Sequence, residues 1–435
     1  MKKLLSFLGL FGATISTSST VVACNKQENP STPTDGQNNN ENHPETDHSE
    51  TENNRINLNS FISQKDLGEI KLQDLTDEKI IQKIKDLNPL SSEEDFSKFL
   101  IEISEYTAKI TPIFNNLKFK GEVTVRFIPI DEQTNGREAV YNKEKQNICE
   151  KIGYFKNESG KWQIRPLKNI TNEVPKKLPW FISDLSKALE NNVSSSIKNL
   201  DKWDTSNVTN MSLLFKNASK FNQKLNFNTS NVTNMQRMFE GASSFNQELD
   251  FDTRNVTDMS YMFLSSFSFN QQLNFNTSNV TNMSFMFSGA TRFNQALSFN
   301  TSNVTNMSNM FKYATNFNKE LNFNTSNVTD MSYMFNDAFK FNQSLSFDTL
   351  KVTNMEGMFK NASDFNSELN FNTSNVTNMS AMFYEAESFN QDISSWDVNN
   401  VTSHELFASV KENKYHPEWT NDKRPTFRQQ NIVNK

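Results

Sequence analysis

Apolar and polar residues alternate in a pattern that repeats every 24 residues over the C-terminal half of the chain. The pair Val-Thr recurs at this interval from Val208 to Val376, and a ninth copy follows at Val401. The pair Phe-Asn recurs in step with it from Phe221 to Phe389. A fixed period in this range is typical of solenoid proteins, in which each repeat forms one coil and stacks on the next. The sequence therefore predicts a solenoid of about nine coils with end caps over residues 174–407.

Positions within a repeat are counted here from its Val, which is position 0. Apolar residues stand at +3, +6, +7, +10 and +13, and steps of three and four place them on one face of a helix. From +13 to +19 the apolar residues stand two or four apart, as in a strand. The polar run at +20 to +23, mostly Asn-Thr-Ser-Asn, predicts a turn. The expected fold class is an α/β repeat solenoid with parallel strands and short helices.

The first and last repeats differ from the interior ones. Interior repeats place Phe two residues after Leu, whereas Trp203 and Trp396 stand three residues after Leu200 and Ile393. Such atypical ends are what the capping coils of a solenoid require. Residues 408–435 are predicted to form a polar C-terminal tail.

The variable columns of the repeat supply a candidate binding face. Positions +5, +8, +9 and +12 differ between repeats while the core columns barely change, and on a helix they would point away from the core. Several aromatic residues stand there, and exposed aromatic residues in a row suggest a binding surface. Neutral sequence change on a solvent-exposed face explains the variation equally well. The candidate residues are Tyr261, Phe285, Tyr313, Tyr333 and Tyr384.

The N-terminus has the pattern of an export signal. Lys2 and Lys3 precede an apolar run from Leu4 to Ile15 that is too short to span a bilayer, so residues 1–23 are predicted to be a signal peptide. The sequence Val21-Val22-Ala23-Cys24 resembles the lipobox of bacterial lipoproteins, which implies cleavage before Cys24 and thioether lipidation of its thiol. Residues 24–55 are polar and are predicted to form a disordered linker. The expected location is the extracellular face of the cell membrane, held by the lipid anchor.

Residues 56–173 show no repeat and are predicted to form a small α+β domain. A helix is expected to begin at Thr76, with Ile80 and Ile84 on its apolar face. The alternation over residues 121–128 predicts a strand. The run Asn157-Glu158-Ser159-Gly160 between two apolar segments predicts a hairpin.

The composition gives no support to a catalytic or nucleic-acid-binding function. The net charge is −6 and there is no basic stripe, which argues against nucleic acid as a partner. No His occurs between His48 and His404, so Cys149 has no partner in this domain to activate it. The Met residues of the repeats are better explained by core packing than by a soft metal. We expect no enzyme activity, no metal and no cofactor.

The repeated Asn-Val-Thr has the form of a glycosylation sequon in eukaryotic secreted proteins. The recurrence of Asn, Thr and Ser at the corners favours polar ladders instead, in which side chains hydrogen-bond from coil to coil.

Two segments identify a family resemblance over about residues 174–407. The segments Trp203-Asp-Thr-Ser-Asn-Val-Thr-Asn-Met211 and Phe389-Asn-Gln-Asp-Ile-Ser-Ser-Trp396 resemble the repeats of BspA-like leucine-rich-repeat surface proteins, and the whole chain resembles their mycoplasma lipoprotein form. The usual unit in that family has 25 residues, so the 24-residue unit departs from it. The resemblance implies an adhesin that binds host extracellular-matrix or cell-surface proteins. It carries over no binding residues, because the shared positions are core and corner positions.

Three functions follow from these features. The first is a lipid-anchored adhesin without enzyme activity. The second is a variable surface antigen or shield without a dedicated ligand, since near-identical repeats allow their number to change by recombination. The third is binding of a soluble ligand by residues 56–172.

Overall fold

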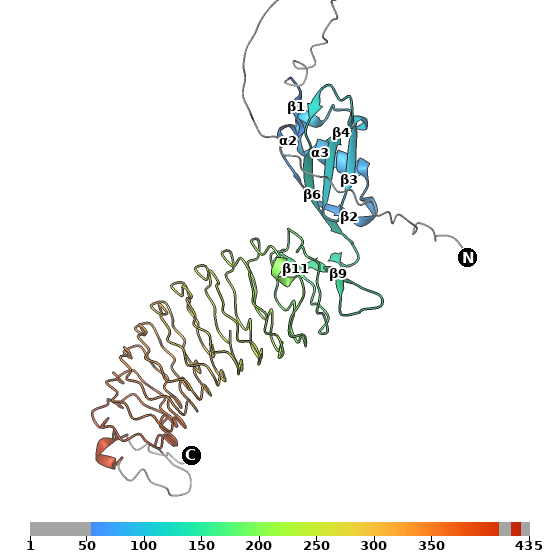
Figure 1. Cartoon of the computed structure of the whole chain (residues 1–435). Helices are drawn as coiled ribbons and strands as arrows, with labels where there is room; N and C mark the ends of the chain where they lie inside the picture. The colour runs from blue at the N-terminus through green and yellow to red at the C-terminus, as the bar shows by residue number, and fades with distance from the viewer. Residues whose placement is uncertain (1–53, 409–418, 428–435) are drawn as a thin grey trace, which may run out of the picture. The chain divides into compact units, whose positions relative to one another are not determined.

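The computed structural model describes residues 54–408 and 419–427. Nearly all its helices and strands lie in residues 56–164 (Figure 1). In chain order they are β1 (Ile56–Asn57), α2 (Leu58–Phe61), β2 (Asp66–Lys71), α3 (Asp77–Leu87), β3 (Phe99–Ile103), β4 (Thr107–Pro112), β5 (Phe119–Lys120), β6 (Val123–Ile130), β7 (Gly136–Arg137), β8 (Val140–Tyr141), β9 (Cys149–Lys151), β10 (Tyr154–Lys156) and β11 (Trp162–Ile164). Short 3-10 turns lie at Leu72–Asp74, Pro89–Ser91, Phe96–Lys98, Leu200–Lys202 and Asn421–Lys423.

The N-terminal sheet has four strands in the order β2-β6-β4-β3. Strand β6 runs parallel to β2 and antiparallel to β4. Its alternate residues Val123, Val125 and Phe127 are buried, which confirms the strand predicted over 121–128. They share one core with Ile80 and Ile84 of α3.

Helix α3 begins where the sequence predicts. The hydroxyl of Thr76 accepts a hydrogen bond from the Lys79 backbone N–H at 3.3 Å, and Asp77 and Glu78 stand in the first turn. Acidic side chains near a helix N-terminus are favourable because the helix dipole is positive there. The helix ends at Leu87, just before Asn88-Pro89.

The predicted hairpin is also present. Strands β10 and β11 pair antiparallel across the turn at Asn157–Gly160, and β7 pairs with the other edge of β10. The buried side chains of Tyr154 and Trp162 belong to the same hydrophobic cluster as the repeats. The repeat core therefore extends back into the hairpin, to residues that the sequence analysis assigned to the α+β segment.

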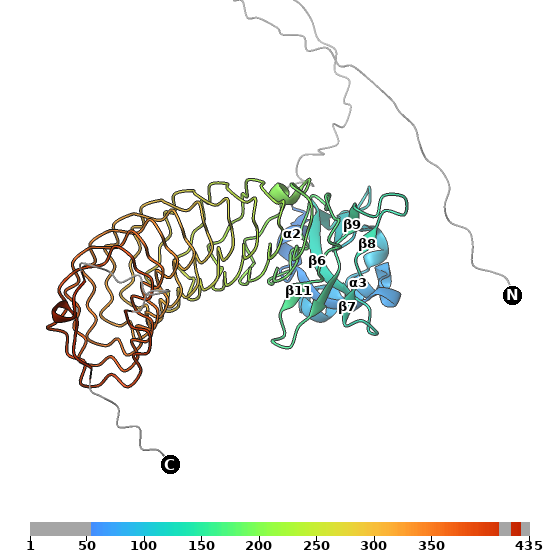
Figure 2. The same ribbon diagram turned by 90° about the horizontal axis from the view of Figure 1, so that it is seen from below.

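The prediction of an α/β solenoid with parallel strands and short helices is wrong. From residue 204 to residue 408 the backbone forms turns, isolated bridges and irregular segments, with no helix and no extended strand. Successive 24-residue coils are joined by single-residue parallel bridges, such as Asn234↔Asp258 and Leu273↔Leu297. The strands of regular length belong to the small mixed and antiparallel sheets that end at residue 164. Figures 1 and 2 show the coils as successive loops of irregular backbone lying side by side.

Left-handed backbone at two positions is what prevents a helix in each coil. From the coil of Leu213 to that of Ala381, φ at +5 lies between 52° and 60°, and φ at +9 lies between 54° and 69°. An α-helix needs φ near −63° at every residue. For an L-amino acid the left-handed conformation costs about 1–2 kcal/mol, so an offsetting interaction is required.

Hydrogen bonds between coils provide that interaction. In the coil that begins at Val232, the backbone N–H groups at +3, +5, +7 and +9 donate to the carbonyls at +2, +4, +6 and +8 of the next coil, over 2.7–3.4 Å. The N–H groups at +6, +8 and +10 donate to carbonyls three residues earlier in their own coil. A helix would instead pair each N–H with the carbonyl four residues earlier. Successive backbone N–H groups from +5 to +10 therefore alternate between bonding to the next coil and closing a turn within their own coil.

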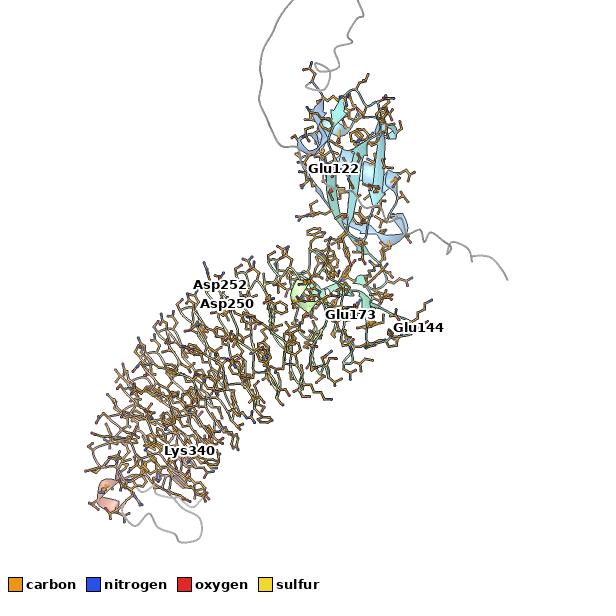
Figure 3. All side chains as sticks on the ribbon, in the orientation of Figure 1. Glu122, Glu144, Glu173, Asp250, Asp252 and Lys340 are labelled. Carbon is orange, nitrogen blue, oxygen red and sulfur yellow. The ribbon has the colours of Figure 1, made fainter. Side chains whose placement is uncertain are left out.

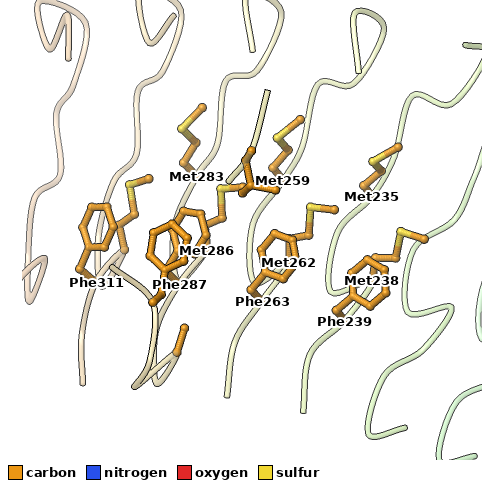
Figure 4. Close-up of a cluster of buried hydrophobic side chains, with 14 of the residues drawn as sticks. Met235, Met238, Phe239, Met259, Met262, Phe263, Met283, Met286, Phe287 and Phe311 are labelled. Atoms are coloured by element: carbon orange, nitrogen blue, oxygen red, sulfur yellow. The ribbon is translucent and has the colours of Figure 1, made fainter. Parts of the chain in front are cut away.

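The buried positions are those that the pattern predicts, although the backbone differs. Phe at +7 forms a column from Phe215 to Phe383 in which neighbouring rings lie 5.5–5.7 Å apart and within 11° of parallel. Phe at +13 forms a second column, 4.0–4.2 Å from the first within each coil. The Met residues at +3 and +6, such as Met259 and Met262, are fully buried beside the rings (Figure 4). Their place in the core supports the packing explanation of the methionines.

The last coils are covered by a segment that the sequence analysis assigned to the tail. Trp419 is 1% exposed and lies edge-on against Phe389, with ring centroids 4.9 Å apart. Its indole N–H donates to the Gln391 carbonyl at 2.9 Å. Trp396, which the sequence placed in an end coil, is buried and stacks on Phe371 at 6.0 Å. Residues 419–427 therefore contribute to the C-terminal cap.

Candidate binding surface

The candidate aromatic residues lie at the turns of the coils, partly exposed. Tyr261, Phe285 and Tyr333 occupy +5, Tyr384 occupies +8 and Tyr313 occupies +9. Tyr313 is 49% exposed, and the other four are half-buried. We use the name aromatic strip for these five residues together with the cations that contact them: Arg237, Tyr261, Phe285, Lys312, Tyr313, Tyr333, Lys360 and Tyr384.

The first group of the strip is a three-layer stack. The Tyr261 and Phe285 rings are 4.6 Å apart and within 7° of parallel. The Arg237 guanidinium carbon lies 3.9 Å from the Tyr261 ring centroid, and Arg237 also forms an ion pair with Glu240 at 2.9 Å. Cation–π contacts at exposed sites contribute about 0.5–1 kcal/mol, so this contact favours the stacked arrangement before any partner binds.

The second group surrounds Lys312. Its ammonium nitrogen lies 5.3 Å from the Tyr313 ring and 5.1 Å from the Tyr333 ring. The Tyr333 hydroxyl donates to the Glu356 carboxylate. A Cβ on Gly357 would lie 2.5 Å from the Tyr333 ring, so the absence of a side chain at this glycine makes room for the ring. Partial burial, and then the Glu356 carboxylate, raise the pKa of Tyr333 to about 12.

The third group is Tyr384 with Lys360, whose ammonium lies 5.3 Å from the ring. Between the first two groups the +5 position is held by Asn309, which is 8% exposed. The structure thus brings the five predicted residues together in three local groups, and the continuous row that the sequence analysis considered is interrupted.

Sequence reasoning missed the cations. Arg237 stands at +5, and Lys312 and Lys360 stand at +8, so each contacts an aromatic ring in a neighbouring column or coil. A comparison of aromatic and basic residues across adjacent columns could have indicated them. The combination of aromatic rings with Arg and Lys is suited to binding a polar macromolecule, because Tyr and Arg are enriched in protein interfaces.

Charged residues also lie elsewhere on the coils. Asp250 and Lys340, labelled in Figure 3, are exposed, and the partly exposed Asp252 forms an ion pair with Arg254 at 2.8 Å. Within the described ranges, no three His, Cys, Asp or Glu side chains come close enough together to hold a metal ion.

Cys149 lies in the core and has no features of a nucleophile. Its side chain is 2% exposed, and its Sγ donates to the Lys151 carbonyl at 3.2 Å. Burial raises the pKa of the Cys149 thiol to about 12, so it is protonated at neutral pH. The thiolate is the reactive form, and this position disfavours it.

The corner residues form the predicted polar ladders. The Asn231 side-chain amide donates to the Ser206 carbonyl of the preceding coil at 2.8 Å, and the same contact recurs at Asn255 and Asn279. The Thr233 hydroxyl donates to the Thr209 carbonyl at 3.2 Å. The Asn side chains of the repeated Asn-Val-Thr therefore bond to the backbone of the preceding coil, as expected for polar ladders.

The signal peptide over residues 1–23, the lipidation site Cys24 and the linker up to residue 53 lie outside the described residues. Those predictions are unchanged by the structure. Among the described residues, none of the helices has the length and apolar character needed to cross a membrane.

Comparison with known proteins identifies a family for the repeats. A family model described as "Mycoplasma protein of unknown function, DUF285" matches the chain three times, over residues 183–298, 273–347 and 345–423. No curated protein and no solved structure matches. The three matches overlap at their ends, as expected when consecutive coils are nearly interchangeable. Together they span residues 183–423, more than half of the 435 residues, and the chain therefore belongs to this Mycoplasma-associated repeat family.

Proposed function

We propose that the protein is a lipid-anchored surface adhesin whose coils present the aromatic strip to host matrix or cell-surface macromolecules. The protein would act by binding alone, without catalysis. Export and lipidation at Cys24 are expected from the sequence, and the resemblance of the repeats to those of BspA-like surface proteins supports a binding role.

The observation that carries the proposal is the aromatic strip. In a coil whose core columns are nearly invariant, the strip positions carry Tyr, Phe, Arg and Lys side chains that are partly exposed and held by ring and cation contacts. Rigid aromatic and Arg side chains are the common anchors of protein interfaces, because they bury a large area at a small cost in conformational entropy.

A binding screen tests this proposal. The purified chain would be passed over a panel of immobilised host matrix proteins, and whole cells that carry the protein would be tested against the same panel. The proposal predicts saturable binding to at least one of them, and antibody against the coils should block binding by the cells. Absence of binding in both formats would contradict an adhesin.

The second candidate, a variable surface antigen or shield, is supported by a separate observation. Column +5 reads Leu213, Arg237, Tyr261, Phe285, Asn309, Tyr333, Gly357 and Ala381, while the buried columns hardly change. Interchangeable coils would allow their number to vary between isolates. Sequencing of related isolates tests this candidate: a fixed coil number with fixed strip residues would contradict it and favour a dedicated ligand.

A further inference from the structure

The loop between β4 and β5 exposes large apolar side chains. Phe114 is 93% exposed and Leu117 is 83% exposed, the highest values among the large hydrophobic residues that the structure describes. Ile113 in the same loop is 47% exposed. Single exposed apolar residues are common on proteins, but several on one short loop indicate an interaction site.

The loop is held in this conformation by its own hydrogen bonds. The Asn116 side-chain oxygen accepts from the backbone N–H groups of Lys118 at 3.1 Å and Phe119 at 2.9 Å, and the Asn116 N–H donates to the Ile113 carbonyl at 3.1 Å. Asn115 has φ 78°, the left-handed conformation that Asn tolerates better than most residues. The loop is thus fixed with its apolar side chains outward.

The loop lies where the N-terminal linker enters the fold. Strand β1 pairs in parallel with β5, and the Ile56 backbone N–H donates to the Lys118 carbonyl at 2.8 Å. Ile56 itself is 41% exposed and adds apolar surface beside the loop. About thirty residues separate this point from Cys24, and a linker of that length with the disorder that the sequence predicts would have a root-mean-square span of about 30 Å. A membrane that holds Cys24 would therefore be within reach of the loop.

The charges around the loop are nearly balanced. Lys98 and Lys118 line a hollow beside the loop together with Glu94 and Asp95, and Lys118 pairs with Glu94. Attraction to anionic lipid is therefore weak, and the apolar side chains have to supply most of the binding energy. The long Lys side chains can keep their ammonium groups in the headgroup region while the loop inserts.

From these features we infer that the loop 113–117 inserts Phe114 and Leu117 into the interfacial region of the lipid bilayer. This inference rests on the proposed function, since the anchor at Cys24 is the reason for choosing a bilayer as the partner. The loop and the lipid would form two contacts with one surface, and the lipid anchor would raise the effective concentration of the loop at the bilayer.

A vesicle-binding experiment with the unlipidated protein tests the inference. The chain from residue 24 onward with Cys24→Ser would be sedimented with vesicles of phosphatidylcholine, alone and mixed with phosphatidylglycerol. The test variant carries Phe114→Ser and Leu117→Ser. The matched control carries Phe267→Ser and Leu350→Ser, which remove an equally apolar pair from the coils, where Phe267 is 48% exposed and Leu350 is 49% exposed. Circular dichroism would establish that all three proteins are folded.

We expect the parent to bind both kinds of vesicle and the control to bind like the parent. The Phe114/Leu117 variant should lose at least about tenfold in partition coefficient, because burial of one such side chain corresponds to a factor of ten or more. Equal binding by parent and loop variant would overturn the inference. Absence of vesicle binding by the parent would overturn it too, including a case in which the loop instead captures a soluble protein.

The result of the vesicle experiment does not depend on whether Cys24 is lipidated. Lipidation of Cys24 is measured independently, by mass spectrometry of the protein isolated from cells, whereas the vesicle experiment contains no lipidated protein. A protein that is lipidated but whose loop does not bind vesicles contradicts the inference alone. A protein that is not lipidated contradicts the proposed anchor, and the vesicle experiment then decides by itself whether the loop binds a bilayer.

Discussion

Replacement of Ala381 by glycine distinguishes the turn structure of the coils from the helix that the sequence suggests. Ala381 stands at +5 with φ 52°, and its N–H donates to the Glu405 carbonyl of the next coil at 2.8 Å. An L-residue in this conformation costs about 1–2 kcal/mol relative to glycine. Glycine loses more entropy on folding, about 0.4–1 kcal/mol. The net expectation for Ala381→Gly is an increase in the free energy of unfolding of about 0.5–1 kcal/mol.

The same substitution in a helix would have the opposite sign, since glycine there costs about 0.8–1.0 kcal/mol relative to alanine. Ala386→Gly in the same coil is the matched control. Ala386 is fully buried at +10, outside the left-handed positions, so its replacement should destabilise the protein by about 1 kcal/mol or more.

Urea unfolding followed by circular dichroism measures the free energy of each variant. A stack of coils need not unfold as one unit, so hydrogen exchange of peptides from residues 376–400 should accompany it and localise the change. Slower exchange in Ala381→Gly and faster exchange in Ala386→Gly are expected. Destabilisation of similar size by both substitutions would refute the left-handed turn at +5.

Three further predictions concern the Phe column of the core and the two side chains whose pKa is raised, Tyr333 and Cys149. Phe263→Ala, inside the first Phe column, should lower the free energy of unfolding measured in urea by about 3–5 kcal/mol. Phe263→Leu should lower it clearly less, and an equal loss in both variants would contradict the stacking. The raised pKa of Tyr333 means that its neutral form is favoured in the fold, so its contribution to stability is complete below about pH 10 and is lost as the pH rises through about 12. In ultraviolet titration, Tyr333→Phe should therefore remove a tyrosine that ionises near pH 12; removal of one that ionises near pH 10 would count against the contact with Glu356. Cys149 should resist a thiol reagent in the native protein and react after unfolding, and rapid native labelling would be the opposing result.

The sequence predicted the buried columns of the coils but not their backbone. Met259, Met262 and Phe263 are buried as the pattern indicates, because any backbone that repeats with the period brings equivalent residues into register. Steps of three and four residues arise from a helix and also from consecutive turns, and apolar spacing alone does not reveal the sign of φ. One signal was present: column +9 is rich in Gly, Asn and Asp, which tolerate left-handed backbone.

The candidate surface was predicted only in part. Tyr261 and Phe285 were named from their column, and they do stack. The contact of Tyr261 with Arg237 depends on how one coil lies against the next. The role of Trp419 in the cap depends on the packing of residues 419–427 against the last coils. Such contacts between distant residues carry no periodic signal in the sequence.

The measurement that tests the central proposal most directly is the affinity of a strip variant for the best-binding matrix protein of the screen. The variant carries Tyr261→Ala, Phe285→Ala and Tyr333→Ala. Its matched control carries Thr257→Ala, Thr281→Ala and Thr329→Ala, which lie in the exposed threonine ladder of the same three coils. If the strip binds the partner, the strip variant should have a Kd about a hundredfold higher than the parent, as expected for the loss of interface hot spots. The control should have the same Kd as the parent. Unchanged affinity in the strip variant, or an equal loss in both, would contradict the proposal that the aromatic strip binds the host partner.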